Sequence, residues 1–299
     1  MILEPSEQFD RIRSAVVAIL DAEIARVDVV AGSVANQDFS VDLADGRRVF
    51  VKTGARSELR AEAWAIGRAA AAGVPVPRVA AYEERTQLTP SPFLVIELLR
   101  SDGELSAEVL RSVGHALRLI HTVPVPGYGR VEVIGDPLAP DSVSGRYDSW
   151  RGFIDSMIDN IDELIRADLM TTDVGDSIRR LATGIDGSPL AGETGVLLHA
   201  DLKRDHLLAL DGKLTGIIDW GDASSGDPAW DLARASMMVA GDFEPLLDGY
   251  PGADFDEVAR ILPIYRILWN TRALSYEYRA GGDWFAEYQR RIASDLDHL

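Results

Sequence analysis

The chain has 299 residues, of which 46% are hydrophobic and 26% charged, with a formal net charge of −18 at pH 7 and no cysteine. The missing cysteines exclude disulfides, zinc ribbons and thiol catalysis, and the acidic charge argues against nucleic acid as a partner, because nucleic-acid binding requires a basic face. No apolar run approaches the roughly 18 residues of a membrane helix, and the N-terminus lacks the pattern of a signal peptide. We therefore expect a cytoplasmic monomer or weak dimer with neither a membrane nor a nucleic-acid partner.

The first third of the sequence has the pattern of a sheet accompanied by two helices. Apolar residues at helical spacing predict helices over residues 7–22 and 58–72. Short apolar or alternating runs predict strands, two of them joined by an Asp45-Gly46 turn. These runs are 27–30, 39–43, 49–52 and 93–96.

The remainder of the chain has mainly helical patterns. The predicted helices are 106–121, 150–166, 229–239 and 255–279. Strand-like runs interrupt them at 195–198, 207–210 and 214–218. A sheet-rich start joined near residue 97 to a helix-rich remainder predicts an α+β fold of two lobes, residues 1–97 and residues 98–299.

Two short polar motifs each follow an apolar strand-like run. His199-Ala200-Asp201 follows the first run, and Asp219-Trp220-Gly221 follows the last. Polar groups at the ends of buried strands are well suited to catalysis, since the strand fixes their position. Phosphoryl transfer requires one carboxylate that orients the attacking hydroxyl and another that holds a divalent metal. Protein kinases carry these groups in the same order, with Asn five residues after the first Asp, where this chain has His206.

Residues 198–233 resemble the aminoglycoside phosphotransferase family of antibiotic kinases, most closely its hygromycin-type and macrolide kinases. The family signature is H-G-D, then Asn, then I-I-D-[WF], then D-P-x-x-D-L-A, and Asp227 to Ala233 match its last part. Ala200 and His206 depart from it, replacing Gly and Asn. The resemblance implies a protein-kinase-like two-lobed fold, with a nucleotide-binding lobe over 1–97 and a catalytic and substrate-binding lobe over 98–299. It also implies ATP or GTP as phosphoryl donor, and Mg²⁺.

The resemblance also assigns roles within this segment. Asp201 would be catalytic, and Asp219 would bind the metal. His206 would be a second metal ligand or would bind phosphate or a metal-bound water, since Mg²⁺ prefers oxygen ligands. Asp227 and Asp231 are expected to cap the following helix and tie down the catalytic loop.

The nucleotide-binding lobe supplies further candidates. Lys52, at the end of a strand, occupies the place of the kinase lysine that contacts the α- and β-phosphates. Glu62, ten residues later, is its expected partner, and Glu58 is the alternative. Ser33 lies in a loop, 31–37, expected to cover the phosphates.

The remaining candidates are expected to bind the nucleotide base, in the segment between the two lobes, and the acceptor. Main-chain atoms of Glu97 and Leu99 are expected to bind the nucleotide base. Residues 127–153 are similar to the hygromycin-type branch, which phosphorylates a sugar hydroxyl. We therefore expect an aminoglycoside or hygromycin-like acceptor, held by the helices 150–166 and 255–279 and by carboxylates near Asp222.

Other acceptors and other classes of protein remain alternatives. A macrolide, a sugar-bearing nucleoside antibiotic or a cellular metabolite could be the acceptor. A signalling protein kinase is disfavoured because only eleven residues separate Asp219 from Asp231 and no A-P-E motif follows. An inactive nucleotide-binding module is disfavoured because Lys52, Glu62 and Asp201 are all retained with Asp219.

Overall fold

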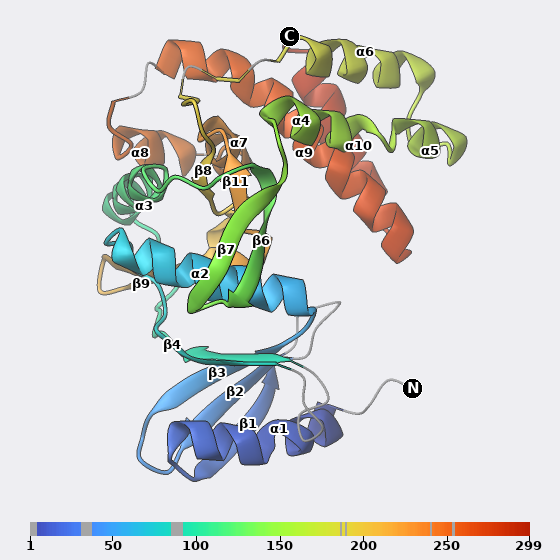
Figure 1. Cartoon of the computed structure of the whole chain (residues 1–299). Helices are drawn as coiled ribbons and strands as arrows, with labels where there is room; N and C mark the ends of the chain where they lie inside the picture. The colour runs from blue at the N-terminus through green and yellow to red at the C-terminus, as the bar shows by residue number, and fades with distance from the viewer. Residues whose placement is uncertain are drawn as a thin grey trace. The chain divides into compact units, whose positions relative to one another are not determined.

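The computed structural model describes residues 5–30, 38–84, 92–185, 187–188, 190–239, 241–252 and 255–299. The chain forms two compact units (Figure 1). The first comprises Met1–Val109, Glu132–Val143 and Asp205–Ala223, and the second comprises Leu110–Val131, Ser144–Arg204 and Ser224–Leu299. The sequence predicted a nucleotide-binding lobe that ends at residue 97 and a catalytic and substrate-binding lobe that begins at residue 98. This functional division stays a prediction.

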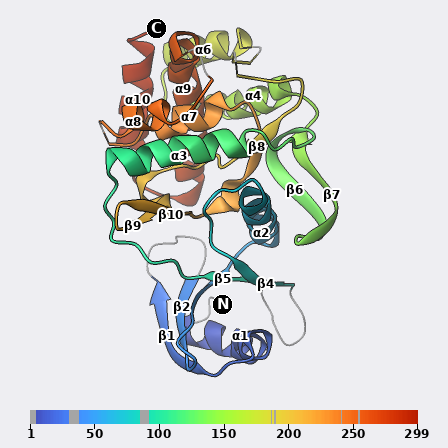
Figure 2. The same ribbon diagram turned by 90° about the vertical axis from the view of Figure 1, so that its left-hand side faces the viewer.

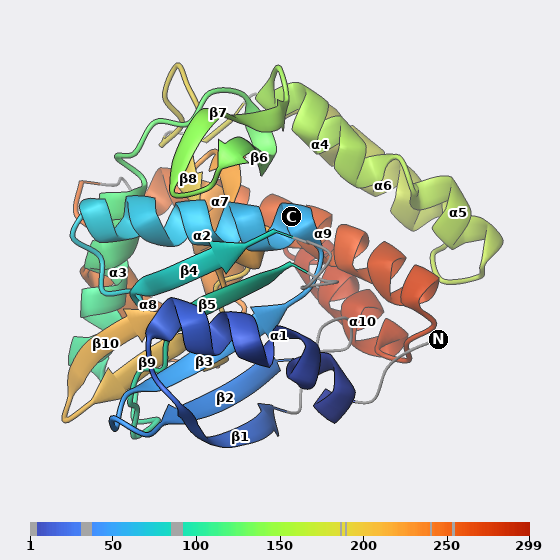
Figure 3. The same cartoon turned by 60° about the horizontal axis from the view of Figure 1, so that its bottom comes forward.

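The first unit contains a five-stranded antiparallel sheet of order β1-β2-β3-β5-β4. Its strands are β1 (Ile24–Val30), β2 (Asp38–Leu43), β3 (Arg48–Thr53), β4 (Val79–Glu83) and β5 (Phe93–Glu97). The helices are α1 (Pro5–Leu20) and α2 (Arg56–Ala71), which lie on opposite sides of the sheet (Figure 3). Both helices and four of the strands were predicted, whereas β4 was missed.

Alternating side chains allow the two faces of this sheet to contact different helices, α1 and α2. Val49 and Val51 of β3 are buried in a core formed with Phe9, Ile12 and other apolar residues of α1. Because successive side chains of a strand point to opposite faces, Phe50 and Lys52 lie on the other face of the sheet from Val49 and Val51. Lys52 reaches α2, where its Nζ contacts Glu62.

A hairpin also belongs to the first unit (Figure 2). It joins β9 (Leu207–Leu210) to β10 (Lys213–Ile217), preceded by the short helix η1 (Arg204–His206) and followed by η2 (Trp220–Asp222). Asp211 and Gly212 at its turn both have positive φ, as a two-residue hairpin turn requires. The Asp102 N–H donates to the Ala209 carbonyl at 2.9 Å, which ties the hairpin to the chain that leaves β5.

The second unit is mainly helical. Its helices include α4 (Trp150–Ile158), α5 (Ile161–Arg166), α6 (Thr172–Thr183), α7 (Ala229–Ala235), α8 (Phe243–Asp248), α9 (Phe255–Ala280) and α10 (Phe285–Leu296). α3 (Ala107–Ile120) begins in the first unit and continues into the second. The predicted helix over 150–166 is divided into α4 and α5, and the helix predicted over 229–239 ends at residue 235.

A four-stranded sheet of order β7-β6-β11-β8 supports the catalytic segment. Its strands are β6 (Tyr128–Asp136), β7 (Ala139–Tyr147), β8 (Val196–Leu198) and β11 (Ser224–Gly226). β6 and β7 were not predicted, because only part of β6 alternates buried with exposed residues and β7 has no buried residue. The α+β class is confirmed. Among the described residues, no helix combines the length and the apolar character needed to cross a bilayer.

Candidate active site

Lys52 lies at the centre of a cluster of charged groups in the first unit. Its Nζ is 2.8 Å from the Glu62 carboxylate and 2.9 Å from Asp219 Oδ1. Glu62 comes from α2 and its side chain is only 2% exposed, whereas that of Asp219, after β10, is 45% exposed. The expected pairing of Lys52 with Glu62 is confirmed. One carboxylate therefore supports the lysine from inside the protein and the other contacts it from a more open side.

The cluster keeps Lys52 charged. Burial disfavours the ammonium form, but the carboxylates of Glu62 and Asp219 outweigh burial and raise the pKa of Lys52. A buried lysine without such partners would lose its proton readily. The side chain is therefore a fixed positive charge, which suits it to bind a phosphate group.

Asp219 is held between Lys52 and His206. His206 Nε2 lies 3.0 Å from Asp219 Oδ2, so each carboxylate oxygen has a basic neighbour. The hydrogen bond from His206 lowers the pKa of Asp219, burial opposes that effect, and Lys52 reinforces the lowering. Asp219 also has φ of 65°, a left-handed backbone that is uncommon outside glycine and is often found at functional sites. This carboxylate is therefore ionised, oriented and accessible.

The donor set fits a metal ion that arrives with a nucleotide. Among the described residues, no group of three or more acidic or histidine side chains could hold a metal by itself. Mg²⁺ in kinases is bound by one or two carboxylates, with phosphate oxygens and water completing its shell. Asp219 fits such a ligand. His206 is buried, and its imidazole contact with Asp219 suits it to orient that carboxylate.

Asp38 is a further member of this cluster that sequence reasoning missed. It is the first residue of β2 and lies directly opposite Lys52 in the strand register. Its Oδ1 is buried and has no hydrogen-bond partner among the described residues. Burial raises the pKa of Asp38, Lys52 lowers it, and Asp219 raises it further. The only signal in the sequence was an acidic residue between the end of the predicted phosphate loop and the start of the next predicted strand.

Asp201 lies in the second unit, directly after β8. Its side chain is 22% exposed, and its Oδ1 accepts a hydrogen bond of 3.0 Å from Arg234 Nε in α7. Lys203 Nζ is 3.7 Å from Oδ2, and its side chain is more exposed. Ala200, immediately before Asp201, has φ of 67°. The backbone thus turns sharply just before the candidate catalytic carboxylate.

Two buried carboxylates fix this turn and the helix that follows. Asp231 accepts hydrogen bonds from the main-chain N–H groups of His199 at 2.8 Å and Ala200 at 2.7 Å. Asp227 accepts one from the Ala229 N–H at 2.9 Å, at the start of α7. The expected roles of Asp231 in tying down the loop and of Asp227 in capping the helix are confirmed.

The remaining candidates lie apart from these contacts. Glu97 ends β5, and its main-chain N–H donates to the Arg78 carbonyl at 2.9 Å. Leu99 follows in the segment after β5, and Asp222 is exposed in η2. Ser33 lies outside the described residues. The roles of all four stay predictions.

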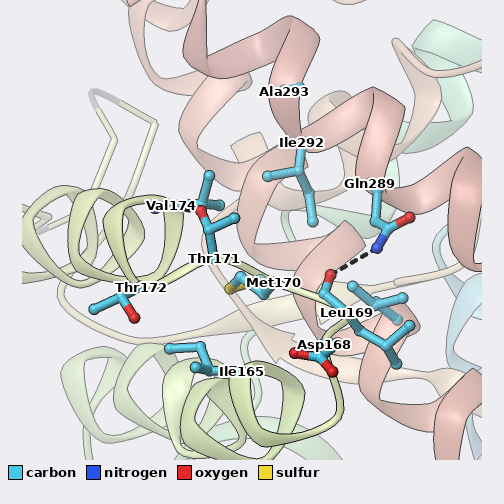
Figure 4. Close-up of a pocket in the computed structure, with 11 residues that line it drawn as sticks. Ile165, Asp168, Leu169, Met170, Thr171, Thr172, Val174, Gln289, Ile292 and Ala293 are labelled. Carbon is cyan, nitrogen blue, oxygen red and sulfur yellow. Dashed lines mark hydrogen bonds between the residues drawn. The ribbon is translucent and has the colours of Figure 1, made fainter.

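The second unit also contains a pocket of about 400 Å³ (Figure 4). It lies between the α5–α6 connection and the helices α9 and α10. Leu274 and Ile292 are buried in its wall, together with Met170, and Gln289 Nε2 donates to the Leu169 carbonyl at 2.8 Å. The pocket is therefore largely apolar with a polar rim.

Comparison with known proteins decides the family. A profile described as the phosphotransferase enzyme family matches residues 26–264. The chain belongs to this family. The resemblance carried by residues 198–233 is thereby confirmed.

One curated relative matches about a third of the chain. The hygromycin-B 4-O-kinase of Escherichia coli is 28% identical over 101 residues, which are 33% of this chain and 28% of that kinase. The match thus spans little more than a quarter of the curated relative.

Solved structures of family members confirm the fold. A thermostable form of the aminoglycoside phosphotransferase APH(4)-Ia, in a ternary complex with ADP and hygromycin B, has a TM-score of 0.72 at 17% identity over 96% of this chain and 98% of its own. The GDP complex of an aminoglycoside 2′-phosphotransferase-IIIa variant has a TM-score of 0.70 at 16% identity over 99% and 98%. The protein therefore has the protein-kinase-like fold of the aminoglycoside phosphotransferases.

Proposed function

We propose that the protein transfers the γ-phosphoryl group of ATP or GTP to a hydroxyl group of a small molecule. The observation that carries the proposal is the cluster in which Lys52 contacts both Glu62 and Asp219 while His206 orients Asp219. Such an arrangement provides a fixed cation for phosphate and an ionised carboxylate for a metal, as phosphoryl transfer requires. Membership of the phosphotransferase family supports the same activity.

In this proposal the first unit binds the nucleotide. Lys52 contacts the phosphates, and Asp219, oriented by His206, holds Mg²⁺. When bound, Mg²⁺ neutralises charge on the phosphate oxygens. The base contacts the main chain of Glu97 and Leu99. Since the Glu97 N–H is already bonded to Arg78, its carbonyl oxygen is the group offered to the base.

Asp201 acts on the acceptor. The acceptor oxygen forms a bond to the γ-phosphorus as the bond to the bridging oxygen breaks. The nucleoside diphosphate leaves, and the proton of the hydroxyl passes to the Asp201 carboxylate. Ser33 in the phosphate loop and Asp222 near the acceptor are subsidiary parts of the proposal.

An antibiotic is the acceptor we favour, and an aminoglycoside or hygromycin-like molecule in particular. The partial match to a hygromycin-B kinase and the complex of a structural neighbour with hygromycin B support this choice. The pocket lined by Ile165 and Leu274 favours a second candidate, an acceptor with an apolar portion such as a macrolide. A cytoplasmic location and a monomeric or weakly dimeric state belong to the same proposal.

The proposal is tested by transfer of labelled phosphate from ATP or GTP to hygromycin B and a panel of aminoglycosides and macrolides. A sensitive host expressing the protein provides the matching resistance screen. Asp201→Asn should lower kcat by about 10²- to 10⁴-fold, the usual contribution of a general base, while leaving nucleotide affinity nearly unchanged. Asp211→Asn, in an exposed turn, is the matched control and should behave as wild type. A kcat for Asp201→Asn within a few-fold of wild type would show that the role given to Asp201 is wrong.

A further inference from the structure

Arg234 is a buried cation placed against the candidate catalytic carboxylate. Its side chain is 10% exposed in α7, and its Nε donates to Asp201 Oδ1 at 3.0 Å. Its guanidinium carbon lies 4.4 Å from the centre of the Trp269 ring of α9. A flat guanidinium on an aromatic face is restricted in both position and orientation.

A buried charge at this place needs an explanation. The neighbouring residues of α7 are buried as well, and an apolar side chain at residue 234 would avoid the loss of hydration that a guanidinium suffers there. The contact with Asp201 offsets that loss and holds the carboxylate. The nearby Lys203 is a poorer anchor, since its Nζ is 3.7 Å away and its side chain is more exposed.

We propose that Arg234, held on the ring of Trp269, is a positioning residue that fixes the carboxylate of Asp201 for proton transfer from the acceptor. Arg234 occupies Oδ1 and thereby directs Oδ2 to the acceptor hydroxyl. The inference rests on the proposed role of Asp201. It adds that the geometry of that carboxylate depends on the helix α7 and, through Trp269, on a second helix, α9.

The expected effects follow from how strongly catalysis depends on geometry. A misplacement of about 1 Å lowers catalytic rates by roughly 10²-fold, so Arg234→Gln should lower kcat by about 10- to 100-fold. Arg234→Lys keeps the charge without the planar donor and should lose less. Trp269→Phe keeps an aromatic ring and should lose less than Trp269→Ala. The dissociation constant of a fluorescent ADP analogue should stay unchanged in all four variants.

A double-mutant cycle separates positioning from a general structural role. If Arg234 acts through Asp201, Arg234→Gln should cause almost no further loss of kcat when Asp201 is already Asn. A structural role would lower the residual activity of both backgrounds alike. The matched control is Arg266→Gln, which breaks the pair of Arg266 with Asp295 in the same unit. The two side chains of this pair are 22% and 13% exposed. It should leave kcat unchanged.

The outcomes distinguish a failure of the role proposed for Asp201 from a failure of the role proposed for Arg234. Each variant is assayed with hygromycin B, or with the acceptor that the panel returns, and its thermal midpoint is measured in parallel. If Asp201→Asn retains activity, the proposed role of Asp201 fails. If Asp201→Asn is inactive but folded Arg234→Gln and Arg234→Lys both keep wild-type kcat, the positioning role of Arg234 is refuted. An additive loss in the double mutant refutes it as well.

Discussion

Replacing Asp231 by alanine should destabilise the second unit severely. The carboxylate is fully buried and accepts the main-chain N–H groups of His199 and Ala200 at 2.8 and 2.7 Å. It also lies 3.2 Å from His121 Nε2. Hydrogen bonds to a charged group contribute about 1.5–3 kcal/mol each, so losing the two main-chain bonds should lower the free energy of unfolding by about 3–6 kcal/mol. Total stabilities are commonly about 5–15 kcal/mol, so the loss is a large fraction.

Urea unfolding followed by tryptophan fluorescence measures this loss. Trp150, Trp230, Trp269 and Trp284 all lie in the second unit, so the signal reports mainly on that unit. Asp231→Asn keeps one carbonyl acceptor and should lose about half as much as Asp231→Ala.

The control for this prediction is Asp248→Asn, because that side chain is 66% exposed and its contact with Arg111 is 3.7 Å. Exposed pairs contribute about 0–1 kcal/mol, so the control should change little. An Asp231→Ala protein within 1 kcal/mol of wild type would refute the conclusion that Asp231 anchors the catalytic loop.

Two further predictions concern the metal site and the backbone before Asp201. Asp219→Asn should weaken Mg²⁺-dependent nucleotide binding and stop turnover, whereas His206→Asn should keep much of the activity, because an amide can still donate to Asp219. A Mg²⁺ titration of nucleotide affinity checks both expectations. A folded but inactive His206→Asn protein would show that the imidazole itself is required. Ala200→Gly should raise the free energy of unfolding by about 0.5–1 kcal/mol, since φ of 67° is strained for alanine and not for glycine; a urea midpoint below that of wild type would contradict this account.

Contacts set by local periodicity could be predicted from the sequence. Strand and helix patterns placed Lys52 at the end of a strand and Glu62 on the next helix, and the kinase pattern then predicted their pairing. The roles given to Asp201, His206 and Asp219 came from the spacing of the kinase-like motifs and from the family resemblance, and they stay predictions. Turn chemistry at residues 45–46 correctly placed the hairpin of β2 and β3.

Features that depend on tertiary packing could not be predicted in this way. β11 consists of Ser224, Ser225 and Gly226, which have no strand pattern, and it forms a strand because β6 and β8 pair with its two edges. The division between α4 and α5 is likewise not marked by a glycine or proline in the sequence. Asp201 and Arg234 are 33 residues apart on a loop and a helix, and no spacing rule connects them.

The segments that carry Asp201 and Asp219 share a backbone feature, and each unit stabilises its own segment. Ala200 and Asp219 both have left-handed backbone without being glycine, a conformation that costs roughly 1–2 kcal/mol per residue. In the second unit the Asp231 carboxylate holds the backbone at residues 199 and 200. In the first unit Lys52 and His206 hold the side chain of Asp219. Because these anchors lie in different units, a substitution at Asp231 should change turnover without changing nucleotide affinity, and a substitution at Lys52 should change nucleotide affinity first.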